Sequence, residues 1–170
     1  MNIAAQPPVQ TDQTIYLKDY QKPSFLVDSI HLDIQVYENH TIVDSTLVMK
    51  RQSAGSLILL GRDLELKSIQ LNGQTLNSDQ YELDSEQLVI TDAPDEIILQ
   101  IQVIIHPESN TQLEGLYKAG DLYVTQNEPE GFRKITFYPD RPDVLSVFTT
   151  RVEADKKYPV LLANGNLLET

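Results

Sequence analysis

The sequence predicts an all-β domain of antiparallel strands, arranged either as one strongly curved, saddle-like sheet or as a two-sheet sandwich. Apolar and polar residues alternate with a period of two in several segments, most cleanly over 99–105. Such alternation is typical of strands with one face toward a core and one toward water. Asn72-Gly73 and Asn164-Gly165 indicate tight hairpin turns, because both positions of these turns need positive φ angles. Helical patterns are weak.

The strands are expected in a regular order along the chain. A half-buried strand over 30–36 turns at Glu38-Asn39-His40 into a returning strand over 41–51. Further strands are expected at 57–60, 69–71, 74–76, 81–84, 87–90, 99–105, 116–117, 122–125, 147–153 and 158–163. His106-Pro107 ends the strand over 99–105, since proline cannot donate to a sheet ladder. Asp140 is expected to cap a single helical turn over 140–146.

Composition limits the class of protein. A chain of 170 residues is long enough for one domain with a buried core. With 25 acidic and 13 basic residues its net charge is −12, which disfavours nucleic acid and anionic membranes as partners because both would repel it. There is no cysteine, so neither a disulfide nor a thiolate metal site can form. Residues 1–13 lack the apolar stretch of a signal peptide, and a cytoplasmic protein is expected.

The domain organisation is expected to be simple. Residues 1–13, rich in Gln, Pro and Thr, are predicted to form a flexible lead-in, and 14–170 to form one β domain. A strand over 158–163 and the Asn164-Gly165 turn predict a C-terminal hairpin whose return strand has too few partners to offset its ordering entropy. We therefore expect the chain to end at a domain boundary, with more chain downstream; the alternative is a short natural C-terminal strand.

The sequence contains no motif for bond cleavage. Its three histidines, His31, His40 and His106, are not spaced four apart, so the zinc-binding His-Glu-x-x-His motif is absent. All three are expected to be solvated surface side chains. Neither a G-x-S-x-G nucleophile elbow nor a glycine-rich phosphate loop occurs. We expect residues 1–170 alone to bind no metal and to catalyse no hydrolysis.

Several motifs in the last third of the chain occur together in a recognisable order. They are Asn110–Tyr117 (NTQLEGLY), Tyr123–Glu128 (YVTQNE), Glu130–Arg133 (EGFR), Tyr138–Asp143 (YPDRPD), Phe148–Thr150 (FTT) and Leu162–Asn166 (LANGN). In this order and spacing they resemble the N-terminal domain of the aminopeptidase N family, which are gluzincin zinc metallopeptidases, and most closely its bacterial alanyl aminopeptidase branch. The first two thirds of the chain match that domain in strand pattern and approximate length only.

The resemblance implies that Gln126 and Glu128 bind substrate. In the family the matching Gln-x-Glu reaches into the active site, where its carboxylate holds the free amino group of a peptide. Gln126 would then line the pocket for the first side chain of that peptide. The zinc cofactor would belong to a downstream catalytic domain of the parent enzyme. The implied partners are thus peptides with a free N-terminus and this downstream domain.

Two further residues are expected to shape the loop that carries Glu128. Pro129 restricts Glu128 to an extended backbone. Family members have a cis bond after the matching glutamate, and proline lowers the cost of that isomer, so the Glu128–Pro129 bond is predicted to be cis. Gly131 is expected to allow a close approach of backbone segments. Arg133 is expected to pair with a nearby acid, and the turn at 140–143 to buttress the loop.

An alternative function remains at this point. The chain is also compatible with a non-catalytic β-sandwich module without peptidase ancestry, such as an adaptor or a carbohydrate-binding domain, in which Glu128 is an ordinary exposed carboxylate. Carbohydrate binders usually present a platform of exposed aromatic rings. The aromatic content of 7% and the absence of Trp weaken that alternative.

Overall fold

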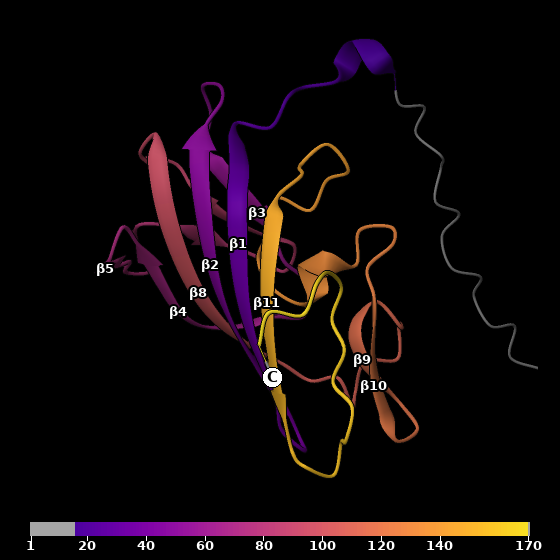
Figure 1. Cartoon of the computed structure of the whole chain (residues 1–170). Helices are drawn as coiled ribbons and strands as arrows, with labels where there is room; N and C mark the ends of the chain where they lie inside the picture. Colours follow the sequence, from indigo (N-terminus) through magenta and orange to yellow (C-terminus); the bar gives the residue numbers. More distant parts are fainter. Residues whose placement is uncertain (1–15, 170) are drawn as a thin grey trace, which may run out of the picture.

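The computed structural model describes residues 16–169 (Figure 1), and the predicted lead-in over 1–13 lies outside them. The described chain is nearly all β, as the sequence predicts, and contains no α-helix. Its elements are η1 (Leu17–Asp19), β1 (Phe25–Val36), β2 (Thr41–Arg51), β3 (Leu57–Leu60), β4 (Glu65–Leu71), β5 (Gln74–Thr75), β6 (Glu82–Leu83), β7 (Gln87–Ile90), β8 (Glu96–Ile105), β9 (Gly115–Ala119), β10 (Leu122–Gln126), η2 (Phe132–Lys134) and β11 (Val147–Ala154). The elements η1 and η2 are single 3-10 turns. Among residues 16–169 none of the helical segments has the length or hydrophobicity needed to cross a membrane.

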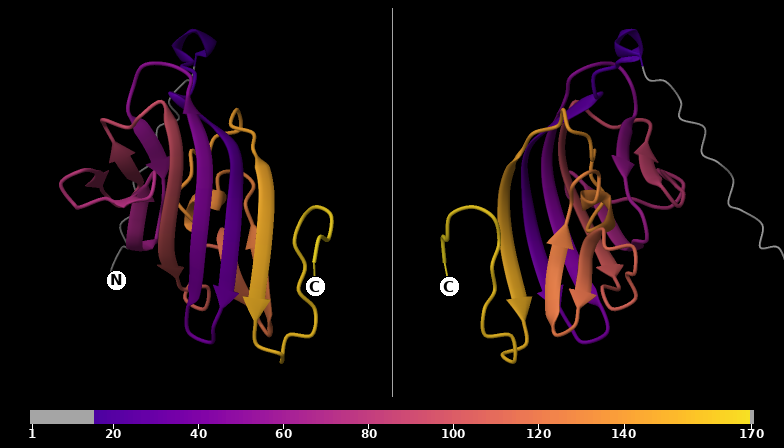
Figure 2. Two further views of the ribbon diagram at one scale, coloured as in Figure 1. Left: turned by 60° about the vertical axis from the view of Figure 1, so that its left-hand side comes forward. Right: turned by 90° about the vertical axis from the view of Figure 1, so that its right-hand side faces the viewer.

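The largest layer is a curved, six-stranded sheet with the order β11-β1-β2-β8-β4-β5 (Figure 2). Its central strands pair so that inward-facing apolar side chains meet, as with Ile30 opposite Leu47 and Leu47 opposite Leu99. Every neighbouring pair in the sheet is antiparallel except β1 and β11, which run parallel with Ser29 opposite Val147. The predicted antiparallel, all-β architecture is confirmed, with this one parallel pair as an exception at the edge. Parallel pairing requires a long connection, and most of the chain separates these two strands.

Two smaller sheets lie on one face of the curved sheet. One contains three strands in the order β3-β7-β6, and the other is the β9–β10 hairpin (Figure 2). The core lies between the layers, where Leu59 of β3 and Leu88 of β7 are completely buried in the same apolar cluster as Leu47 of β2. This arrangement places the hairpin, and the loop that follows it, at the side of the molecule next to β11 (Figure 1).

The segment between β10 and β11 is fastened to β3. The backbone N–H of Leu60 donates to the carbonyl oxygen of Tyr138 at 2.8 Å, and the N–H of Tyr138 donates back at 3.0 Å. The predicted helical turn over 140–146 is wrong, since these residues contain only turns and the single helical turn of this region is η2. Asp140 does not act as a helix cap because its carboxylate accepts the backbone N–H of Arg133 at 3.1 Å.

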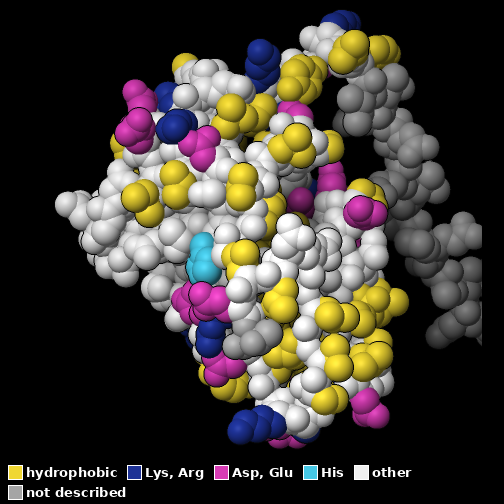
Figure 3. All heavy atoms as spheres, in the orientation of Figure 1, with side chains coloured by type: hydrophobic (Ala, Val, Ile, Leu, Met, Phe, Trp, Pro, Cys, Tyr) yellow, Lys and Arg dark blue, Asp and Glu magenta, His cyan; other side chains and the backbone are white. Residues whose placement is uncertain are grey.

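The predicted C-terminal hairpin is also wrong. Residues 155–169 contain no strand, and Asn164-Gly165 forms a bend rather than a hairpin turn. The segment runs beside β11 without pairing (Figure 2), and Figure 3 shows hydrophobic side chains gathered on this side of the molecule. The exposed large apolar residues of the segment are Val160, Leu161, Leu162, Leu167 and Leu168. Alternation alone does not produce a hairpin when no neighbouring surface covers its apolar face.

The segment that precedes β1 is tied to the loop before β11. Tyr20 Oη donates to Asp143 Oδ2 at 2.8 Å, and Arg141 Nη2 donates to the carbonyl oxygen of Gln21 at 2.8 Å. Arg141 also forms a bidentate ion pair with Asp143, in which Nε donates to Oδ1 at 2.9 Å and Nη2 donates to Oδ2 at 2.7 Å. We term these contacts of Tyr20, Gln21, Arg141 and Asp143 the tether, and the Arg141–Asp143 ion pair lies at its centre.

This tether predicts a depressed carboxyl pKa. The hydrogen bond from Arg141 holds the pKa of Asp143 below its ordinary value, against the opposing effect of partial burial, and Tyr20 lowers that pKa further. A carboxyl whose pKa is lower in the folded state stabilises the fold above the unfolded pKa of about 3.9, and that stabilisation is lost as the pH falls through the folded pKa. We expect an NMR titration to show Asp143 protonating below pH ~3.9, and Arg141→Gln to raise its pKa. An identical titration curve in Arg141→Gln would contradict this assignment.

Candidate functional site

The β9–β10 hairpin positions the candidate site. Its strands pair from Ala119 opposite Leu122 to Gly115 opposite Gln126, around a turn in which Gly120 has φ +63°. Gln126 is thus the last residue of a paired strand. We term residues 126–131, which leave the hairpin at this point, the β10 loop.

The β10 loop has a defined backbone. The Glu128–Pro129 bond is cis, which confirms the prediction. Gln126 Nε2 donates to the carbonyl oxygen of Glu128 at 2.8 Å, so the side chain of one predicted site residue holds the backbone of the other. At the end of the loop, the N–H of Gly131 donates to the carbonyl oxygen of Asn127 at 3.0 Å. The loop is therefore closed by hydrogen bonds at both ends.

The two glutamates of the loop have different surroundings. Both are exposed. Glu130 adopts a left-handed backbone with φ +64°, and its Oε2 lies 3.3 Å from Arg133 Nη2. The ion pairs within residues 16–169 do not include Glu128. Glu128 thus presents a solvated carboxylate on a fixed backbone, which is an arrangement suited to binding a cationic group.

Glycines allow the loop to lie tightly against the hairpin. Gly131 is buried, and a Cβ atom there would overlap the carbonyl oxygen of Gln126 and lie 2.8 Å from Asn127 Cα. Gly115 has φ +69°, and a Cβ atom there would lie 2.7 Å from Lys134 Cβ. Both positions therefore need glycine, because the atoms that a Cβ would meet are backbone atoms or the Cβ atom of Lys134.

Charged side chains of η2 anchor the end of the loop to the rest of the fold. Arg133 pairs with Asp140, with 3.0 Å between Nε and Oδ2 and side-chain exposures of only 11% and 14%. This confirms the expected pairing of Arg133 with an acid. Lys134 is 4% exposed, and its Nζ donates to Asp63 Oδ2 at 2.8 Å and to Gln112 Oε1. Sequence reasoning missed Lys134, since lysine is seldom buried and its partners lie far away in the chain.

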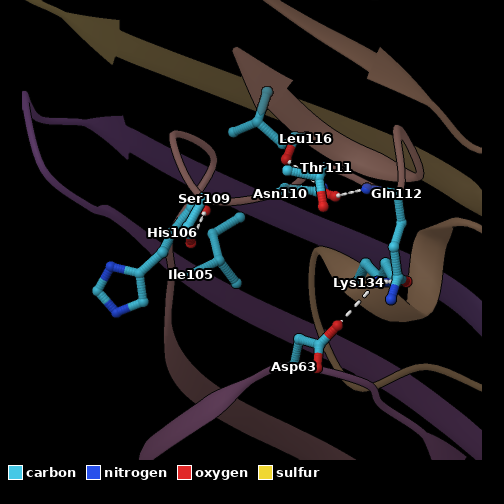
Figure 4. A pocket seen from close by; sticks show the side chains of 9 residues that line it. All are labelled: Asp63, Ile105, His106, Ser109, Asn110, Thr111, Gln112, Leu116 and Lys134. Atoms are coloured by element: carbon cyan, nitrogen blue, oxygen red, sulfur yellow. Dashed lines mark hydrogen bonds and ion pairs between the residues drawn. The ribbon is translucent and has the colours of Figure 1, made fainter. Parts of the chain in front are cut away.

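Lys134 lines a cavity of about 310 Å³, together with Leu116 at the start of the hairpin (Figure 4). The cavity is lined by residues from the loop after β3, the end of β8 and the segment that leads into β9, among them Asp63, His106 and Gln112. The lysine ammonium thus joins two loops to η2. These contacts of Lys134 support the start of the hairpin rather than the exposed β10 loop itself.

The described residues do not provide a zinc site. Within 16–169 no three His, Cys, Asp or Glu side chains come close enough to hold a metal ion. His31 is exposed on β1, and His106 Nδ1 lies 3.1 Å from the carbonyl oxygen of Asn39. His40 stacks on Tyr37 with 4.9 Å between ring centroids and is half-buried, which corrects the expectation of a fully solvated side chain.

Comparison with known families identifies the fold and its ancestry. The model of the family described as Peptidase M1 N-terminal domain matches residues 18–170. The chain belongs to this family. The predicted resemblance is thereby confirmed, and membership of the M1 N-terminal domain family argues against a module without peptidase ancestry.

Curated relatives of this M1 N-terminal domain are aminopeptidases. Aminopeptidase N of Caulobacter vibrioides is 42% identical over 158 residues, which cover 92% of this chain and 18% of the relative. Aminopeptidase N of Escherichia coli is 42% identical over 160 residues, again covering 92% of this chain and 18% of the relative. The chain therefore spans less than a fifth of the length of these curated relatives.

Solved structures share the architecture. Aminopeptidase A of Legionella pneumophila, in complex with aspartic acid, superimposes with a TM-score of 0.84 at 30% identity, covering 90% of this chain and 19% of that one. An M1 zinc metallopeptidase from Deinococcus radiodurans gives a TM-score of 0.66 at 21% identity and covers 78% of this chain and 33% of that one. The second likeness concerns the fold alone.

Proposed function

We propose that this M1 N-terminal domain recognises the free N-terminal amine of a peptide on behalf of a larger zinc aminopeptidase. The observation that carries the proposal is the exposed Glu128 carboxylate on a backbone fixed by Gln126 and Gly131, in a chain 42% identical to aminopeptidases N. Hydrolysis and zinc binding would belong to a catalytic domain downstream in the same protein, since residues 16–169 provide no metal ligand set. A cytoplasmic location, without nucleic-acid or membrane partners, remains a prediction from composition.

The proposed mechanism uses charge and distance. A carboxylate accepts charge-assisted hydrogen bonds from an ammonium group, and these are about twice as strong as bonds between neutral groups. If Glu128 is held at a fixed distance from the scissile bond, it selects peptides with one residue between their amine and that bond. Gln126 Nε2 is engaged by the Glu128 carbonyl oxygen. The Oε1 of Gln126 would then be the atom that faces the first side chain of the peptide, as an acceptor.

Glu128→Gln in the full-length enzyme tests this function. We expect kcat/KM for free-amine peptides to fall about 10- to 100-fold, because the loss of one charge-assisted hydrogen bond costs about 1.5–3 kcal/mol. The activity on a matched substrate that lacks the α-amine should change little. Glu82→Gln, which alters an exposed glutamate in the separate β3-β7-β6 sheet, is the control. An unchanged kcat/KM in Glu128→Gln would contradict the proposal.

A further inference from the structure

We infer that Arg133 is a positioning residue, which holds Glu128 in place by fixing the far end of the β10 loop. This inference rests on the proposed function of Glu128. It concerns a residue two positions beyond the loop whose side chain points away from solvent, with 11% exposure. Arg133 therefore acts through the loop and not through contact with a substrate.

Arg133 is bound to Asp140 by its backbone and its side chain at once. Its N–H and its Nε donate to Asp140 Oδ2 at 3.1 and 3.0 Å, and its Nη2 donates to the Asp140 carbonyl oxygen at 2.9 Å. Three bonds to one residue fix both the backbone at Arg133 and the direction of its guanidinium group. Charge-assisted bonds with this little exposure are weakly screened by solvent.

The same guanidinium contacts the loop. Arg133 Nη2 lies 3.3 Å from Glu130 Oε2, and Glu130 is the residue held in the left-handed region at φ +64°. That region is unfavourable for a residue with a side chain, so the turn depends on contacts that stabilise it. Glu130 lies two residues after Glu128, so the position of this turn decides where the Glu128 side chain projects.

Asp140, to which Arg133 is bound, is itself held in place by the neighbouring β3 strand. Asp140 follows Tyr138 closely, and Tyr138 is buried and paired through two backbone hydrogen bonds with Leu60 of β3. The carbonyl oxygen of Arg133 itself accepts the N–H of Arg62 at 2.9 Å, just beyond β3. Glu128 thus lies between two fixed points, the paired end of β10 on one side and Arg133 on the other.

Arg133→Lys in the full-length aminopeptidase tests the inference. Lysine keeps the positive charge, but a single ammonium on a flexible stem cannot reproduce the planar fork that reaches Asp140 and Glu130 together. We expect the ratio of kcat/KM for a free-amine substrate to kcat/KM for its desamino analogue to fall about 10-fold, since small displacements at a binding group cost rate. Arg151→Lys is the control, because Arg151 pairs with Asp33 at 2.8 Å on the six-stranded sheet, and its ratio should not change.

A double-mutant cycle separates positioning from a purely structural role. If Arg133 acts through Glu128, Arg133→Lys should leave the ratio unchanged in a Glu128→Gln background. An equal further loss in that background would overturn the inference. The inference would also be overturned if Glu128→Gln lowers the ratio and Arg133→Lys leaves it unchanged. That result would leave the proposed function intact. An unchanged ratio in Glu128→Gln would instead overturn the proposed function and, with it, this inference.

A second variant covers the case in which Arg133→Lys does not fold. Asp140→Asn keeps the shape and one acceptor oxygen at this position but removes the charge that holds the guanidinium. We expect the same loss of the substrate ratio, again absent in the Glu128→Gln background. A folded Asp140→Asn enzyme with the wild-type ratio would overturn the inference.

Discussion

Gly131→Ala in the full-length aminopeptidase proposed above is expected to lower kcat/KM for the proposed free-amine substrates about 100-fold. Gly131 has φ −86°, which alanine adopts readily, so the effect comes from space alone. The new Cβ atom would overlap the carbonyl oxygen of Gln126 and approach Asn127 Cα to 2.8 Å. These are backbone atoms that cannot rotate aside, and the β10 loop must shift. A displacement of about 1 Å at a site that orients substrate costs about 100-fold in rate.

Gly120→Ala provides the matched control. Gly120 forms the tip of the same hairpin, and a Cβ atom there meets nothing within 4 Å, although its φ of +63° is unfavourable for alanine. We expect this variant to lose about 1–2 kcal/mol of stability without loss of kcat/KM. Steady-state kinetics and thermal melts of both variants measure the two effects separately. Equal kinetic losses in the two variants would show that crowding at Gly131 is not the cause.

The strands could be predicted wherever their pattern is local. The segments 41–51 and 57–60 coincide with β2 and β3. The predicted start at residue 30 misses the first part of β1, because the pairing register shifts between Val27 and Ser29 and this irregularity breaks the alternation. A register shift between Leu66 and Ser68 has the same consequence in β4, where only 69–71 was predicted. The parallel pairing of β11 with β1 has no local signal at all.

The features of the candidate site also differ in how far the sequence could predict them. The resemblance of a short motif, directly after a predicted strand, to the aminopeptidase N family implies the cis bond to Pro129, which the structure contains, and the roles of Gln126 and Glu128, which stay predictions. By contrast, the partner of Lys134 is Asp63, which is 71 positions away, and the partner of Tyr20 is Asp143, which is 123 positions away. Such pairs leave no periodic trace in the sequence, because only the packing of the layers brings them together. The supporting contacts of the loop therefore needed the structure.

Phe137→Ala is expected to destabilise residues 1–170 by about 3–5 kcal/mol, the usual range for a buried phenylalanine. Phe137 is 2% exposed and is one of the largest fully buried side chains. A Cβ atom at Gly61 would overlap its ring, so the ring directly covers the backbone at the end of β3. The next residue, Tyr138, is fixed to Leu60 by two backbone hydrogen bonds. The surrounding chain cannot close around the missing ring, and most of the cavity should remain.

Leu145→Ala separates this effect from the general loss of apolar surface. Leu145 is 85% exposed in the same connecting segment, and its truncation should change stability by less than about 0.5 kcal/mol. Urea unfolding measures the free energy of unfolding of both variants. In a thermal melt, the expected loss in Phe137→Ala corresponds to a fall in Tm of about 6–20 °C for a chain of this size. A loss below about 1 kcal/mol would contradict the assignment of this segment to the core.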